Sequence, residues 1–403
     1  MTGEDGVRDD SDRRWATRIG ESALFLAPHI VALIRLEDLV PLLETDHRVQ
    51  CIFTVPEDGE DRPDAADLVR AHGGLLLPKQ QAARTTHGLV LAGSNRGLDA
   101  VRGPKLLVPH GGGLGQYRSG ELITGLHPEQ LLRDGRVLAD RIVLTHQREL
   151  DLLAELCPQA VPHAVVTGDV AFDRLVASAP YRDQYRRALG VTGDREIICV
   201  TVSWSARSGF GSNPDLFRHI VDAAPDARVV ASLHPQIWSQ HGTGQVLGWL
   251  ADAIEAGLVV LAPHSDWRGA VTAADVVLAD YTSVGTFAAG AGTPVLRIPH
   301  DAQPLLPGSP TAVLAAETPL WDRSRPLLPQ LEAAREAQRH GLGAHIAGLL
   351  TSRPGQAGKI LRQEMYALLG LGEPARAVPV SPAPLPRCTT WPLIPLPRTR
   401  PRG

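Results

Sequence analysis

Short apolar runs recur along the chain and alternate with stretches whose apolar residues follow helical spacing. The first run, Ala23–Ala27, precedes a helically spaced stretch over Ile30–Leu43, and Val49–Val55 is the next run. Further runs follow at Leu75–Leu77, Leu89–Ala92 and Leu106–Val108. Strands that alternate with helices are typical of βαβ units, in which right-handed crossovers build a parallel sheet. The pattern therefore predicts an α/β fold.

A second series of strands begins near Glu196. Ile197–Val202 is continuously apolar, as expected of a strand that is covered on both faces. Later runs follow at Ala227–Leu233, Val259–Leu261, Val276–Ala279 and Val295–Ile298. The two series predict two Rossmann-like domains that face each other across a cleft, with boundaries at 21–180 and 181–350.

The two ends of the chain differ from this pattern. Residues 1–20 are charged and polar, and we expect them to be disordered. Apolar residues at helical spacing predict a C-terminal helix within 351–372. Beyond it, the chain is rich in prolines interspersed with arginines, and its apolar residues have no regular spacing. We therefore expect 373–403 to be a disordered Pro/Arg tail.

Composition narrows the functional classes. The 403 residues are 43% apolar and carry a net charge of −4, which gives no sign of the basic face that nucleic acid requires. Cys51, Cys157, Cys199 and Cys388 lack metal-ligand spacing, which favours a reducing compartment. The N-terminus has no apolar signal-peptide core, and no apolar run reaches bilayer length. We expect a soluble cytoplasmic protein. Peripheral membrane contact and the oligomeric state stay open.

The most informative segment is the turn Asp280-Tyr281-Thr282-Ser283, which follows the apolar run Val276–Ala279. A helix that begins at such a turn presents free backbone N–H groups and the positive end of its dipole. Either Thr282 or Ser283 would cap the helix and leave the other hydroxyl free for an anion. The turn predicts a phosphate or diphosphate site that includes Asp280, although an ordinary capped crossover helix also fits.

A histidine and a glycine run follow the apolar run at Leu106–Val108. His110 stands before Gly111, Gly112 and Gly113, and glycines at a strand end let a ligand approach the backbone closely. An imidazole there could act as general base on a hydroxyl group. His29 follows the first strand and is the alternative base, although a helix-capping role fits it better.

Two other strand ends carry polar groups. Ser203, Ser205 and Arg207 follow Ile197–Val202, and His234-Pro235 follows Ala227–Leu233. Hydroxyl groups and a guanidinium suit a phosphate, and side chains at successive strand ends of one sheet converge on one crevice. The chain's D-x-D triplet lies in the polar N-terminus at residues 10–12, so we predict no carboxylate-bound metal.

The order of these motifs resembles the GT-B glycosyltransferases and, within them, the CDP-glycerol glycerophosphotransferase family. The matching segments are His110-Gly111, Thr201–Arg207, His234-Pro235, Ala279–Ser283 and Gly292–Val295, and Gly168–Asp173 is similar to a further segment of the family. Pro109 stands where the family usually has Trp, and Arg207 is displaced from the family's Pro-Thr-Trp-Arg pattern. The resemblance is therefore to a divergent member, and these departures leave the transferred group open.

By this resemblance, the N-terminal domain would hold a hydroxyl acceptor and the C-terminal domain a nucleotide-diphosphate donor, with CDP preferred. A glycosyl or polyol-phosphate group would be transferred, and no separate cofactor is implied. His110 would deprotonate the acceptor. His234, Ser283 and either Ser205 or Arg207 would hold the diphosphate, since positioned donors can stabilise phosphoryl charge without a metal.

Three other functions stay open. A CMP-dependent sialyltransferase-like enzyme would add an acidic base, for which Glu57-Asp58-Gly59 is the candidate, although that tripeptide also fits a solvated loop. A UDP-sugar 2-epimerase-like enzyme would share the two-domain fold. The altered motifs also fit a non-catalytic GT-B protein that binds nucleotide without turnover.

Overall fold

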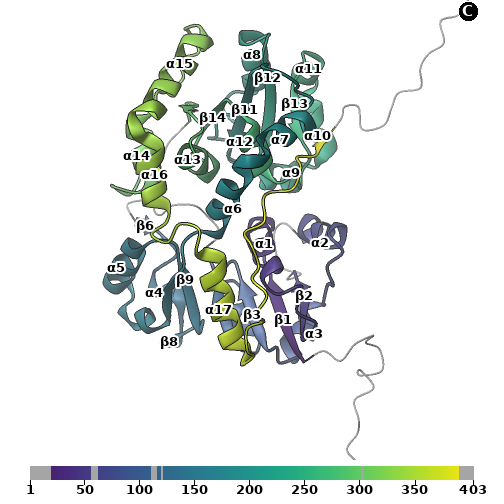
Figure 1. Ribbon diagram of the computed structural model, residues 1–403, viewed down its shortest axis with the longest axis vertical. Coiled ribbons are helices and arrows are strands. Elements are labelled where there is room, and N and C mark those ends of the chain that lie inside the picture. The colour runs from purple at the N-terminus through teal and green to yellow at the C-terminus, as the bar shows by residue number, and fades with distance from the viewer. Residues whose placement is uncertain (1–19, 56–61, 110–115, 119–120, 301–303, 390–403) are drawn as a thin grey trace, which may run out of the picture. The chain divides into compact units, whose positions relative to one another are not determined.

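The computed structural model describes residues 20–55, 62–109, 116–118, 121–300 and 304–389 (Figure 1). Its packing divides the chain into two compact units. The first unit comprises Met1–Val108, Leu138–Arg141 and Leu361–Val378, and the second comprises Pro109–Val137, Ile142–Ile360 and Pro379–Gly403. Each unit contains parallel strands and helices, as the alternating pattern predicts.

Parallel strands form the centre of the first unit. β1 (Glu21–Leu26) pairs with β2 (Val49–Thr54) and with β3 (Leu89–Ala92), and β3 pairs with β4 (Lys105–Leu107). The helices of this unit include α1 (Ile30–Glu37), α2 (Arg62–Ala71) and α3 (Lys79–Arg84). The apolar run at 75–77 forms a single bridge beside β2 instead of a full strand.

The C-terminal helix α17 (Ala357–Leu369) contributes a buried side chain to the first unit. The hydroxyl of Tyr366 donates to Asp46 at 2.9 Å, and Arg48 donates to both oxygens of the same carboxylate. These hydrogen bonds, first from Arg48 and then from Tyr366, hold the pKa of Asp46 well below its usual range despite burial. The helix α17 lies within 351–372, where the sequence predicts a C-terminal helix, and Tyr366 ties it to the first unit.

The second unit contains a six-stranded sheet in the order β15-β14-β11-β12-β13-β16. Its parallel strands are β11 (Ile197–Val202), β12 (Arg228–Leu233), β13 (Val259–Leu261), β14 (Val276–Ala279) and β15 (Val295–Arg297), and β16 (Cys388–Thr389) pairs antiparallel with β13. The five parallel strands coincide with the apolar runs of the second series, so those predictions are confirmed.

Side chains along β11 alternate between two cores, one on each face of the sheet. Ile198 and Val200 pack on one face with Phe217 of α8 (Leu216–Ala223). Cys199 packs on the other face with residues of α12 (Trp267–Ala273) and α13 (Ser283–Gly290). Because both faces are covered, every residue of β11 is buried, which explains its continuous apolar run.

Further elements complete the second unit. They are β5 (Gln116–Arg118), β6 (Glu121–Ile123), α4 (Pro128–Leu131), β7 (Leu132–Arg133), β8 (Arg136–Val137), β9 (Arg141–Leu144, whose first residue is assigned to the first unit), α5 (Gln147–Leu156), β10 (Ala164–Val166), α6 (Val170–Ser178), α7 (Arg182–Ala188), α9 (Pro235–His241), α10 (Thr243–Trp249), α11 (Ala251–Glu255), α14 (Pro310–Glu317), α15 (Leu327–Ala337) and α16 (Gly343–Leu350). Short 3-10 turns connect several of these elements.

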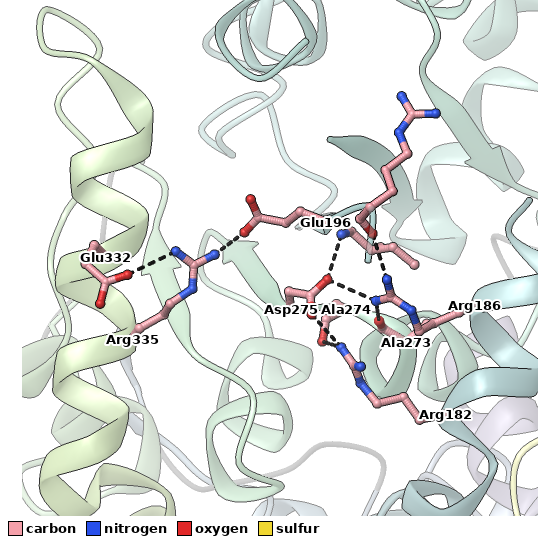
Figure 2. A network of polar contacts seen from close by, with 10 residues as sticks. Arg182, Arg186, Glu196, Ala273, Ala274, Asp275, Glu332 and Arg335 are labelled. Atoms are coloured by element: carbon pink, nitrogen blue, oxygen red, sulfur yellow. Dashed lines mark hydrogen bonds and ion pairs between the residues drawn. The ribbon is translucent and has the colours of Figure 1, made fainter. Parts of the chain in front are cut away.

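An ion-pair network fastens α7 to the amino ends of β11 and β14 (Figure 2). The carboxylate of Asp275 accepts from the backbone N–H of Ile197 at 2.8 Å, from Arg182 at 2.7 Å and from Arg186 at 3.0 Å. Burial opposes ionisation of Asp275, but these hydrogen bonds outweigh it and lower its pKa. The network lies at the amino edge of the sheet and is structural.

Part of the Pro/Arg tail has fixed partners. Residues 379–389 belong to the second unit, and Cys388 and Thr389 form the strand β16 beside β13. Composition alone predicts disorder for the whole of 373–403. The prediction is wrong for 379–389, because no regular spacing of apolar residues indicates that this segment packs on the second unit. In the hydrogen bonds that hold it, the tail contributes backbone groups, which any sequence supplies.

Within the part of the chain that the structure describes, no helix combines the length and the apolar character needed to cross a bilayer.

Candidate functional site

The sheet of the second unit reverses its strand order between β11 and β14. From β11 the chain continues outward to β12 and β13 on one side, and then returns to β14 and β15 on the other side. All five strands are parallel, so their carboxyl ends share one edge. At such a switch point the loops leave in opposite directions and open a crevice for ligands. The residues that follow β11 and β14 are Ser203 and Asp280.

Asp280 joins these two strand ends. Its carboxylate accepts from the backbone N–H of Ser203 at 2.8 Å, from the Ser203 hydroxyl at 3.0 Å and from the backbone N–H of Gly209 at 2.9 Å. Burial raises the pKa of Asp280, against hydrogen bonds from Gly209 and Ser203 that lower it. The structure therefore brings the predicted residues Ser203 and Asp280 into contact, and Asp280 fixes the loop between residues 203 and 209.

The helix α13 begins directly after this carboxylate. Thr282 is its cap, since the Thr282 hydroxyl accepts from the backbone N–H of Gly285 at 3.3 Å. Ser283 is the first helical residue, and its hydroxyl has no hydrogen-bond partner among the described residues. A Cβ on Gly285 would lie 2.7 Å from the Cβ of Ala279, so this glycine lets the helix pack closely on β14. Of the two predicted capping hydroxyls, the one at Thr282 is used.

His234 follows β12 at the same edge of the sheet. Its backbone N–H donates to Val202 at 3.2 Å, and its Nδ1 accepts from the backbone N–H of Gln236 at 3.2 Å. Pro235 is the first residue of α9, where a missing N–H costs nothing and the fixed φ favours a helix start. His234 is thus held as the cap of α9 beside the end of β11.

Ser205 and Arg207 lie in the loop that Asp280 fixes. The Ser205 hydroxyl accepts from the backbone N–H of Arg207 at 3.2 Å, and both residues are exposed. Trp204 between them is 45% exposed. The structure places Ser205 and Arg207 on the same loop as Ser203, where both are more exposed than Ser203.

His110, Gly111, Gly112 and Gly113 fall outside the described residues, as does the tripeptide at 57–59. His29, in the first unit, caps α1, because its Nδ1 accepts from the backbone N–H of Ala32 at 3.1 Å. The helix-capping interpretation of His29 is therefore confirmed.

Two residues at the sheet edge were missed by the sequence analysis. Gly209 donates to Asp280, and a Cβ at this position would come within 2.6 Å of Ile298 Cγ2. His300 follows β15, with Nδ1 3.1 Å from the carbonyl oxygen of Ile298 and its ring 5.8 Å from that of Tyr281. His300 could have been found from the sequence, because it follows a predicted strand. The neighbours of Gly209 in the sequence give no such signal.

Several solved structures are similar to this chain in fold. The wall teichoic acid polymerase TagF is similar with a TM-score of 0.61 at 12% identity, over 87% of this chain and 89% of that one. A TagF structure soaked with CDPG has a TM-score of 0.60 at 11% identity, with the same coverage.

Two further structures share the fold. MnaA of S. aureus, solved with UDP, has a TM-score of 0.54 at 15% identity, over 89% of this chain and 99% of that one. A putative UDP-N-acetylglucosamine 2-epimerase from Listeria monocytogenes has a TM-score of 0.54 at 17% identity, over 90% of this chain and all (100%) of that one. At these identities the likeness establishes the fold, and the predicted α/β fold of the GT-B type is confirmed.

No protein-family model matches the sequence. No curated protein sequence matches it either.

Proposed function

We propose that this chain is a GT-B-type transferase that binds a nucleotide-diphosphate donor, with CDP preferred, at the carboxyl ends of β11 and β14. It would move a glycosyl or polyol-phosphate group to a hydroxyl acceptor. The observation that carries the proposal is the loop that Asp280 holds beside the N-terminus of α13, at the switch point of the sheet. This arrangement offers an anion backbone N–H groups and a hydroxyl in fixed positions.

Charge and hydrogen bonding assign a role to each group. The Ser283 hydroxyl and the first N–H groups of α13 would donate to the phosphoryl oxygens, and the helix dipole would favour their negative charge. His234 and the loop residues Ser205 and Arg207 would supply further donors. In phosphoryl transfer, positioned donors lower the barrier by stabilising charge that builds on the leaving group.

Nucleotide binding is the direct test. Thermal unfolding is measured with CDP, CMP, UDP and GDP, because a ligand that binds the folded state raises the unfolding temperature. We expect CDP to stabilise most. Ser283→Ala should weaken this stabilisation, whereas Ser324→Ala, which alters an exposed hydroxyl bonded to Asp322, should leave it unchanged. If none of the four nucleotides stabilises the chain, the proposal fails.

Catalysis is tested separately at His110. The resemblance assigns this residue the role of base, and a base acts on the acceptor instead of the donor. His110→Ala should therefore abolish turnover and leave CDP binding intact. An active His110→Ala variant would transfer the role to His29 or to Asp58.

A second candidate is a UDP-sugar 2-epimerase-like enzyme. It is favoured by the similarity to MnaA, whose structure contains UDP, and to the putative 2-epimerase. The same thermal-unfolding measurement separates the two candidates, since stabilisation by UDP in place of CDP would favour the epimerase. Nucleotide binding without turnover of any acceptor or sugar would indicate a non-catalytic GT-B protein.

A further inference from the structure

The segment Ser381–Thr389, here called the strap, lies along the second unit after the chain has left α17 (Figure 1). Its composition, with Pro382, Pro384 and Pro386, favours an extended backbone. An extended segment leaves its backbone groups available to partners outside itself. In this protein the partners come from α6, α7 and the loop between β13 and α12.

Ala383 anchors the middle of the strap. Its backbone N–H donates to the Ser178 hydroxyl at 2.8 Å, and its carbonyl oxygen accepts from the Tyr185 hydroxyl at 2.6 Å. The side chain is 6% exposed and belongs to the apolar core on the α12 face of the sheet. A Cβ on Gly269 would lie 3.1 Å from Pro386 Cδ, so α12 approaches the strap closely at a residue without a side chain.

The end of the strap holds the loop that follows β13. Cys388 and Thr389 pair with the last two residues of β13. Arg387 then fixes the next turn, because its carbonyl oxygen accepts from the backbone N–H of Ala262 at 2.8 Å and its N–H donates to the Ser265 hydroxyl at 2.9 Å. This loop leaves the carboxyl end of a parallel strand, and therefore belongs to the same sheet edge as His234 and Ser203.

We infer that the strap is a positioning element of the nucleotide site: it holds the loop 262–266 in the conformation that binds the donor. The inference rests on the proposed function for its ligand and on the contacts of Ala383 and Arg387 for its mechanism. Without the strap, β13 is an edge strand with unpaired backbone groups, and the loop after it loses two hydrogen bonds. The loop then samples other conformations, and the nucleotide binds only those molecules whose loop is in the binding conformation.

Two full-length variants, altered two positions apart, test the strap. Ala383→Arg forces a charged side chain into the core, whereas Leu385→Arg places the same charge at a side chain that is 54% exposed. Hydrogen exchange read by mass spectrometry reports protection at 259–266, and calorimetric titration reports CDP affinity. For Ala383→Arg we expect faster exchange there and a Kd for CDP raised about tenfold, as when the competent fraction falls to about one tenth. Leu385→Arg should change neither.

A shortened chain gives the second test if Ala383→Arg fails to fold. A chain that ends at Val378 lacks the strap, and a chain that ends at Thr389 retains it and is the control. A peptide of residues 379–389, added to the chain that ends at Val378, should restore both protection and CDP affinity. Restoration in trans distinguishes positioning from a general loss of stability.

Each outcome decides the inference. Unchanged exchange at 259–266 without the strap overturns it, and faster exchange with unchanged CDP affinity overturns the link to the nucleotide site. A wild-type chain that binds no nucleotide refutes the proposed function instead, and exchange at 259–266 then still decides whether the strap holds the loop.

Discussion

Replacing Asp280 by alanine removes the acceptor that joins the ends of β11 and β14. Three donors then lose their partner: the backbone N–H and hydroxyl of Ser203, and the buried backbone N–H of Gly209. A buried donor without a partner costs about 1–3 kcal/mol, and Ser203, which is half-buried, can recover part of its bonding from water. Removing a buried carboxylate also removes its desolvation cost. We therefore expect a net loss of about 2–3 kcal/mol in the free energy of unfolding.

Thermal unfolding followed by circular dichroism measures this loss. In a unit of this size we expect Asp280→Ala to lower the unfolding temperature by about 4–10 °C. Asp280→Asn should lie between alanine and wild type, because its amide keeps one acceptor oxygen. Asp222→Ala is the control, since that carboxylate is 54% exposed, pairs with Arg218 on the surface and should contribute nothing measurable.

The Asp280 variants should also differ from wild type in their affinity for nucleotide. A loop without Asp280 has no fixed position beside α13, so CDP should bind Asp280→Ala more weakly at a temperature where the variant is still folded. If Asp280→Ala unfolds within about one degree of wild type, the carboxylate does not hold the loop and the reasoning from its hydrogen bonds is refuted.

Three further predictions follow from burial and close contacts. Gly209→Val should destabilise the second unit by about 1–3 kcal/mol in chemical denaturation, because its Cβ would overlap Ile298, and an unchanged midpoint would contradict this contact. The pKa of Asp46 is lowered by Arg48, so its stabilising effect is present above about pH 4 and is lost as the pH falls further. Asp46→Asn should therefore be less stable than wild type at neutral pH and approach it in acid, whereas a constant difference would contradict the linkage. Burial raises the pKa of Cys199 to about 12, so iodoacetamide should modify this thiol after unfolding and not before, as peptide mapping would detect.

Much of the fold could be predicted because its signals are local. The strands β11, β13 and β14 follow from continuous apolar runs, and a run of this kind needs no knowledge of distant residues. The turn chemistry of residues 280–283 likewise predicts that Thr282 or Ser283 caps α13, and in the structure the cap is Thr282. The positions of Ser203, His234 and Asp280 at strand ends followed in the same way.

The partners of those residues could not be predicted from local pattern. Asp280 accepts from Gly209, which lies 71 positions away, and nothing in either neighbourhood indicates the pair. Ala383 sits in a segment whose prolines suggested disorder, yet its backbone is bonded to Ser178 and Tyr185. Such contacts depend on which surfaces the folded core brings together.

By itself the sequence determined the strands, their covering helices and the polar groups at the strand ends, because periodicity and turn chemistry act over a few residues. The tertiary structure decided that β11 and β14 are neighbours, which places Ser203 and Asp280 at one switch point. It also decided that the strap closes the edge at β13. Both outcomes arise from long-range packing, in which backbone groups far apart in the chain satisfy one another once the two cores have formed.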